Sequence, residues 1–167
     1  MTKTTLLPDL RQAITFTIYG RPQQRGSKQA VLIPKRGGGW VEKNGRPIVA
    51  AKDDNPNSKA WMSQVCDAAR EAFQGELIRG PVRLTVRFYF TRPKNHFRTG
   101  SKAHLLRDDA PTWHAQTPDL DKLTRCLADS LTGVVLADDK QIAAYGERMG
   151  KFWTTDAERA EVTIEQL

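Results

Sequence analysis

The sequence has few of the features that mark membrane-bound or secreted proteins. No apolar run approaches the length needed to span a bilayer, and the N-terminal segment MTKTTLLPDLRQ has no apolar signal-peptide core. No internal repeat is present, and the length of 167 residues suits one domain with a real hydrophobic core. These features predict a globular cytoplasmic protein without membrane association.

Cysteine is also scarce. The two cysteines, Cys66 and Cys126, fall on the apolar faces of predicted helices and have no C-x-x-C spacing. They are therefore predicted to be buried free thiols rather than zinc ligands or a disulfide.

Charge is abundant and unevenly distributed. Residues 1–108 contain 20 Lys and Arg against 8 Asp and Glu, whereas residues 109–167 contain 6 against 11. The net charge of +7 thus combines a basic region with an acidic one. This pattern favours a protein that holds phosphates with one region and carries out chemistry with another.

The acidic region centres on residues 117–142, TPDLDKLTRCLADSLTGVVLADDKQI. Thr117 is predicted as the N-cap of a helix with Pro118 in its first turn, and Thr132–Gly133 as its end. Its buried face is predicted from apolar residues four positions apart, which are Leu123, Leu127 and Leu131. Its opposite face carries Asp121, Arg125 and Asp129.

More acids flank this helix. Asp119 precedes it, and Asp138 and Asp139 follow the short apolar run 134–137, which is predicted to be a buried strand. Packing of that strand on the helix would bring carboxylates together, and hard divalent cations prefer oxygen ligands. We expect a site of three or four carboxylates for Mg²⁺, with Mn²⁺ as the other suitable ion, drawn from Asp119, Asp121, Asp138 and Asp139.

The run PDLDKLTR, followed by DSLTGVVLADDKQI, resembles the signature of RusA-type Holliday-junction resolvases. The resemblance implies a metal-dependent endodeoxyribonuclease that acts as a homodimer on four-way DNA junctions in recombination and repair. By position it implies that Asp119, Asp121, Asp139 and Arg125 are the catalytic residues. The family pattern has lysine at Arg125 and asparagine at Lys122; an arginine keeps the charge but cannot give up a proton.

The rest of the chain predicts an α+β fold: a single domain with a mixed β-sheet and two main helices packed against it. Residues 1–12 are predicted to be mobile, and residues 13–167 to form the RusA-like domain. Strands are expected at 13–20, 30–33, 47–50, 81–91 and 160–165, a hairpin turn at Asn44–Gly45, a helix at 58–73 and a long loop at 92–116.

Basic residues on loops are candidate contacts to branched DNA. These candidates are Arg21, Arg25, Lys28, Lys35, Arg36 and Lys122. The glycine-rich hairpin that carries Lys35 and Arg36 is equally consistent with a plain surface loop. His114, close in sequence to Asp119, is a weaker candidate for a role in the site.

Two other functions are compatible with the sequence. A non-catalytic DNA-binding module could use the aspartates for a structural metal, and a D-x-D motif could bind a nucleotide-sugar through Mn²⁺. The small size and basic character argue against the second.

Overall fold

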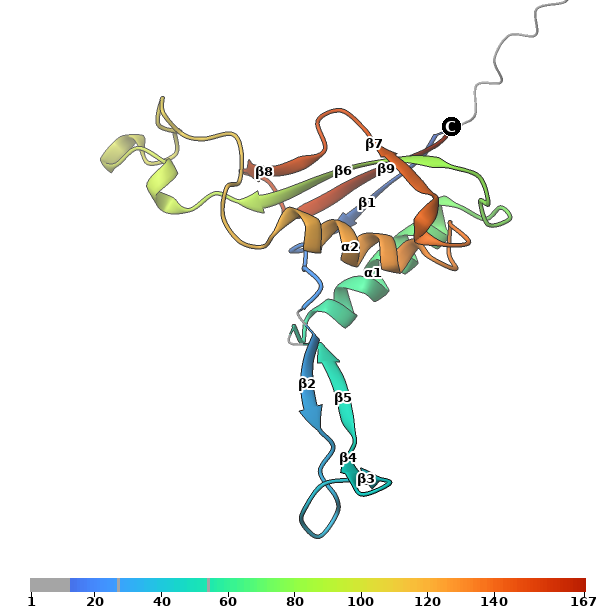
Figure 1. The fold of residues 1–167 in the computed structure, drawn as a ribbon. Coiled ribbons are helices and arrows are strands. Elements are labelled where there is room, and N and C mark those ends of the chain that lie inside the picture. The colour runs from blue at the N-terminus through green and yellow to red at the C-terminus, as the bar shows by residue number, and fades with distance from the viewer. Residues whose placement is uncertain (1–12, 27, 54) are drawn as a thin grey trace, which may run out of the picture.

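Figure 1 shows the computed structural model, which describes residues 13–26, 28–53 and 55–167. A mixed sheet carries two helices on one face, and a two-stranded arm projects away from this body. The predicted α+β fold is thereby confirmed. Residues 1–12, predicted to be mobile, lie outside the described part of the chain.

The main sheet has the order β1-β9-β6-β7, and β8 also pairs with β6. Its strands are β1 (Ile14–Tyr19), β6 (Val82–Thr91), β7 (Ile142–Tyr145), β8 (Gly150–Thr154) and β9 (Arg159–Gln166). β9 runs antiparallel to both β1 and β6, whereas β7 and β8 run parallel to β6 along successive parts of its length. β6 is therefore the strand that joins the two halves of the sheet.

The alternation of β6 decides which face of the sheet is covered. Val82, Leu84, Val86, Phe88 and Phe90 are all buried, and the residues between them face the other side. The helices α1 (Ser58–Ala72) and α2 (Leu120–Leu131) pack over this apolar face. The three leucines predicted to form the buried face of α2 have no exposed surface.

The arm consists of two short antiparallel pairs. β2 (Lys28–Leu32) pairs with β5 (Val49–Asp53), and β3 (Glu42–Lys43) pairs with β4 (Arg46–Pro47). Asn44 and Gly45 connect β3 to β4 with φ of 54° and 71°. Positive φ at both positions is the geometry of a type I′ turn, so the predicted hairpin is confirmed.

The start of α2 differs from the prediction. The N-cap is Asp119 rather than Thr117, and Leu120 is the first helical residue. Asp119 has extended backbone angles, φ −72° and ψ 136°, and the Thr117–Pro118 peptide bond is cis. Pro118 therefore lies before the helix and not in its first turn.

The predicted strand at 134–137 is wrong. This segment folds into tight turns, with the Gly133 N–H donating to the Leu136 carbonyl at 2.7 Å and the Val135 N–H donating to the Leu131 carbonyl at 2.9 Å. Val135 and Leu136 are still fully buried. A short apolar run predicts burial, but periodicity alone does not distinguish a strand from a buried turn.

The long loop at 92–116 contains two 3₁₀ turns, η1 (Lys94–His96) and η2 (Gly100–Lys102). A third, η3 (Asp139–Gln141), leads into β7. None of the helices in the described part of the chain has the length and apolar character to cross a bilayer.

The burial of Leu127 predicts a large stability effect. Leu127→Ala should lower the free energy of unfolding by about 2–5 kcal/mol, because it removes apolar contacts and leaves a cavity in the core. Urea unfolding of the variant measures this loss. Arg70→Ala on the exposed side of α1 is the control and should change stability by no more than about 0.5 kcal/mol; a similar small effect for Leu127→Ala would contradict the packing.

Candidate active site

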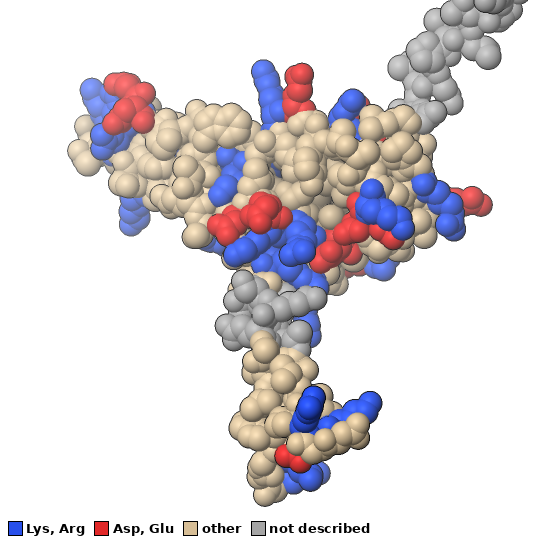
Figure 2. Space-filling model, in the orientation of Figure 1, with Lys and Arg blue, Asp and Glu red and all other residues tan. Residues whose placement is uncertain are grey.

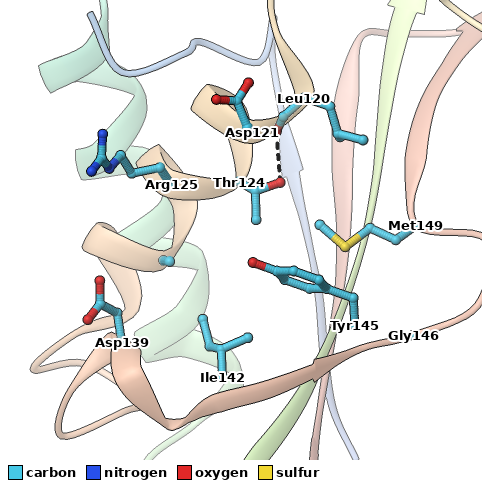
Figure 3. A pocket seen from close by; sticks show the side chains of 10 residues that line it. Leu120, Asp121, Thr124, Arg125, Asp139, Ile142, Tyr145, Gly146 and Met149 are labelled. Atoms are coloured by element: carbon cyan, nitrogen blue, oxygen red, sulfur yellow. Dashed lines mark hydrogen bonds between the residues drawn. The ribbon is translucent and has the colours of Figure 1, made fainter. Parts of the chain in front are cut away.

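A pocket of about 790 Å³ lies between α2 and the segment from η3 to β8. Asp121, Arg125 and Asp139 line it on one side, and Ile142, Tyr145 and Met149 line the other (Figure 3). Leu120, Thr124 and Ala128 of α2 complete its lining. The structure thus brings three of the four predicted catalytic residues, Asp121, Arg125 and Asp139, into one cavity. These three residues form what we call the charged edge of the pocket, and the apolar side chains lie opposite them.

The charged edge follows from how α2 packs. Leu123 and Leu127 face the core, so Asp121 and Arg125 are exposed on the other side of the helix. Within the described residues, none of Asp121, Arg125 and Asp139 has an ion-pair partner. The carboxylates and the guanidinium are therefore available to a ligand that enters the pocket.

Asp119 does not line this pocket. Its carboxylate pairs with Lys122 Nζ at 3.1 Å, and its backbone N–H donates to Gln24 Oε1 at 2.8 Å. The Lys122 carbonyl in turn accepts from the Arg25 N–H at 3.1 Å. The loop after β1 therefore holds the first turn of α2 through two hydrogen bonds.

Lys151 holds the segment that leads into Asp119. Its Nζ donates to the carbonyls of Gln116, at 2.6 Å, and Pro118, at 2.7 Å. Burial lowers the pKa of Lys151, and the negative charge of Asp119 acts in the opposite direction. We attribute to Lys151 a positioning role for the entry to α2.

Asp138 is occupied in capping η3. Its carboxylate accepts from the Lys140 N–H at 3.1 Å and pairs with Lys140 Nζ at 3.0 Å, while its own N–H donates to Gln141 Oε1 at 2.8 Å. The backbone hydrogen bond from Lys140 is the main cause of the lowered pKa of Asp138. Asp138 therefore orients the turn that presents Asp139.

Gln141 ties this turn to the sheet. Its buried Nε2 donates to the carbonyls of Ile78 and Gly80 at 2.8 and 2.9 Å. Sequence reasoning did not predict the roles of Gln24, Gln141 and Lys151 in positioning the site. The capping-box spacing of Asp138 and Gln141 is the signal in the sequence that could have identified Gln141.

Two of the predicted DNA contacts lie on the loop that packs along α2. Arg25 pairs with Asp129 at 3.5 Å, and Arg21 pairs with Glu158 at 3.7 Å. In Figure 2 acidic and basic side chains are interspersed over the region of α2. Lys122 belongs to the same region through its pair with Asp119.

The other predicted contacts lie on the arm. Lys35 and Arg36 are exposed beside Trp40, and basic side chains gather at the tip of the arm (Figure 2). The end of the arm with β3 and β4 lies well away from α2 (Figure 1). The backbone of Lys28 begins β2, but its side chain is outside the described part of the structure.

The predicted metal ligands are carboxylates, which are suitable ligands for a divalent cation, but fewer of them lie together than was predicted. Two carboxylates, from Asp121 and Asp139, line the same pocket. Nowhere in the described ranges do three His, Cys, Asp or Glu side chains lie close enough to share one ion. The described residues of one chain therefore place two carboxylates at the pocket, and a metal site with all four acids stays a prediction.

His114 is buried close to the entry of α2. Its ring packs between Phe90 and Trp153, with ring centroids 4.3 and 4.2 Å away. Its Nδ1 has no hydrogen-bond partner among the residues that the structure describes. Burial first, and the positive charge of Lys151 second, hold the pKa of His114 below its usual value of 6.5. His114 is thus a packed core residue in this structure and does not line the pocket.

Comparison with known protein families finds a match over most of the chain. Residues 33–165 match the family described as endodeoxyribonuclease RusA, so the match includes α2, η3 and the whole pocket lining. No curated protein matches the chain.

The lowered pKa of His114 predicts a pH-dependent stability. In the unfolded chain the His114 imidazole takes up a proton near pH 6.5, whereas in the folded chain it does so only at lower pH. The free energy of unfolding should therefore fall as the pH decreases below about 6.5, by at most ~1.4 kcal/mol per pH unit for one group. Urea unfolding between neutral and mildly acidic pH measures the slope. His114→Phe should flatten it, while the exposed-site control His104→Gln should not; equal slopes for all three proteins would refute the assignment.

Proposed function

The chain belongs to the endodeoxyribonuclease RusA family of Holliday-junction endonucleases, and from this we propose that it resolves four-way DNA junctions in recombination and repair with a divalent metal ion. The observation that carries the proposal is the pocket that joins Asp121, Arg125 and Asp139 inside the matched region. Two carboxylates and a guanidinium at one cavity suit phosphodiester hydrolysis, which needs both cation ligands and a phosphate contact.

We assign Asp121 and Asp139 as the ligands that one chain contributes to Mg²⁺ or Mn²⁺. A bound ion would offset charge on the scissile phosphate and lower the pKa of a water molecule. Asp119 is the further ligand that the family pattern suggests, and Asp138 is the further candidate that its place beside Asp139 suggests. In the structure each of them has a lysine partner, so either would have to exchange that lysine for the ion.

A homodimer is part of the proposal for two reasons. Resolving a four-way junction requires two symmetric cuts, which two identical subunits related by a twofold axis supply. The described residues of one chain also fall short of a three-acid ligand set. A second copy of the chain would supply the third carboxylate ligand.

Arg125 is proposed to contact the phosphate that is cut. Its guanidinium is exposed at the pocket rim and has no carboxylate partner among the described residues. Arginine forms two parallel hydrogen bonds to phosphate oxygens and stays protonated at any working pH. It would therefore stabilise negative charge that develops on phosphorus and would not act as a base.

The basic residues near α2 are proposed to hold the DNA backbone. Arg25 and Lys122 are paired with Asp129 and Asp119 without DNA, so phosphates would have to compete with these carboxylates. Arg21, Lys28, Lys35 and Arg36 would add contacts along the loop and the arm. Such contacts predict affinity that falls as salt rises.

A non-catalytic DNA-binding module with a structural metal is the alternative. The pairing of Asp119 with Lys122 and the capping role of Asp138 favour it, because they leave fewer acids for chemistry. The two functions differ in one outcome, since only an endonuclease cuts its DNA.

We expect a labelled four-way junction to be cut in Mg²⁺ and to stay intact when EDTA removes the metal, with linear duplex measured beside it. Asp121→Asn should lower the cleavage rate by at least ~100-fold, because it removes a charged cation ligand. Junction binding should stay equal or become tighter, since a negative charge near the phosphates is lost.

The matched control is Asp67→Asn on the exposed side of α1, which should cleave like the parent protein. An intact junction with parent protein in Mg²⁺ and in Mn²⁺ would support the non-catalytic module. Loss of junction binding in folded Asp121→Asn would count against the assignment of this residue.

Arg125→Ala should reduce kcat more than junction affinity, because the proposed contact strengthens as charge develops on the phosphate. Single-turnover cleavage and binding titrations measure the two effects separately. Arg125→Lys keeps the charge but loses the paired hydrogen bonds, and should fall between the parent and the alanine variant. Equal losses of kcat and affinity would make Arg125 a simple backbone contact.

A further inference from the structure

The face of the sheet opposite the helices carries a second hollow, separate from the pocket described above. It has a volume of about 240 Å³ and is lined by Arg87, Tyr89, Trp113, Arg148 and Phe152. Arg87 and Tyr89 occupy positions of β6 between the buried residues, and Phe152 of β8 lies in register with Tyr89. The hollow is therefore on the side of β6 that neither α1 nor α2 covers.

The Trp113 ring is exposed but held in place. The His114 N–H donates to the Lys151 carbonyl, and the Trp153 N–H donates to the Thr112 carbonyl, both at 3.0 Å, so residues 112–114 extend the sheet beyond β8. The ring lies 4.6 Å from that of Phe152 and directly over Gly150. A side chain at position 150 would place its Cβ 2.9 Å from the indole, so glycine makes room for the ring. An indole that is 57% exposed is thus presented on a firm backbone.

The charges around the hollow are positive. Within the described part of the chain, neither Arg87 nor Arg148 has an ion-pair partner. The nearby acid, Glu161, is neutralised by Arg159 at 2.9 Å and accepts a hydrogen bond from Tyr89 at 3.2 Å. Arg159 also lies over the Tyr89 ring, 4.1 Å from its centroid. The hollow combines a free aromatic face with two unneutralised guanidinium groups.

We propose that this hollow binds an unpaired nucleotide of single-stranded DNA, with the base stacked on Trp113 and its phosphate held by Arg87 and Arg148. Aromatic faces stack on bases of any sequence, and arginines beside them bind the backbone. The hollow is smaller than the ~300–1,000 Å³ of pockets for drug-sized ligands, which suits a single planar ring. Duplex DNA cannot use it in this way, since its bases already stack on each other.

This site lies across the sheet from α2. Lys151 and Phe152 are neighbours on β8, and their side chains point to opposite faces because strand residues alternate. Lys151 holds the entry to α2, while Phe152 lines the hollow. A DNA strand that leaves the pocket could therefore reach the hollow by passing around the edge of the sheet that residues 112–114 form beside β8. The proposal depends on the chain binding DNA but does not depend on cleavage.

The test is binding of a fluorescein-labelled oligothymidylate to the full chain, measured by anisotropy in EDTA so that no strand is cut. Trp113→Ala should weaken binding about 10-fold, whereas binding of linear duplex should change by less than about twofold. Arg87→Gln should lower the slope of log affinity on log salt by about 0.7, the value for one phosphate contact to a single strand.

Two matched controls lie on the same sheet. Tyr19→Ala removes another exposed aromatic, from β1, and Arg83→Gln removes an arginine four residues earlier on the same face of β6. Both should bind the oligomer like the parent. Equal effects of Trp113→Ala and Tyr19→Ala would overturn the proposal. If Trp113→Ala fails to fold, judged by its thermal transition, Arg87→Gln against Arg83→Gln decides the question.

Two other results would also overturn it. Thymidine monophosphate that binds as tightly as the oligomer would make this a site for free nucleotides. A change of oligomeric state in Trp113→Ala, with oligomer binding unaltered, would make the face a contact between two copies of the chain. Junction cleavage is measured separately, so either proposal can fail while the other stands.

Discussion

Burial of the leucine face of α2 is the constraint on which the candidate site depends. Leu123, Leu127 and Leu131 are fully buried between α1 and the sheet, which fixes the rotation of the helix about its axis. Once that rotation is fixed, Asp121 and Arg125 have to lie on the exposed edge. The chemistry of the pocket is thus set by hydrophobic packing on the other side of the same helix.

The rotation of α2 does not by itself fix the position of the segment before the helix or of η3, which carries Asp139. Polar side chains from distant parts of the chain hold these two segments in place. Gln24 accepts from the Asp119 N–H, Lys151 donates to the Pro118 carbonyl, and Gln141 anchors η3 to the segment before β6. Each satisfies a backbone group that regular secondary structure leaves unpaired. Because the three come from different elements, the site is assembled only when the whole sheet is in place.

The sequence predicted the elements whose pattern is local. The alternation along β6, the leucine spacing of α2 and the Asn44–Gly45 turn each reflect a geometry that repeats within a few residues. The parallel pairing of β7 and β8 with β6 was not predicted, because both strands are short and their partner is distant in sequence. The same applies to Lys151 and Gln24, whose roles depend on contacts that no local pattern encodes. For residues 134–137 the local pattern was only partly informative. Their apolar character correctly predicted burial, but the segment forms tight turns and not the predicted strand.

The four predicted acids are close in sequence, but they differ in whether a lysine neutralises their charge. Asp119 is balanced by Lys122 and Asp138 by Lys140, while Asp121 and Asp139 have no lysine or arginine partner among the described residues. Unbalanced carboxylates at one cavity repel each other, and an approaching cation removes this repulsion. The paired acids would have to give up a lysine, whereas the unpaired ones would give up only water. Among the described residues, this division leaves Asp121 and Asp139 as the acids that line the pocket. The proposed cation site would therefore need a further carboxylate, brought by a second chain or freed by the release of Lys122 from Asp119.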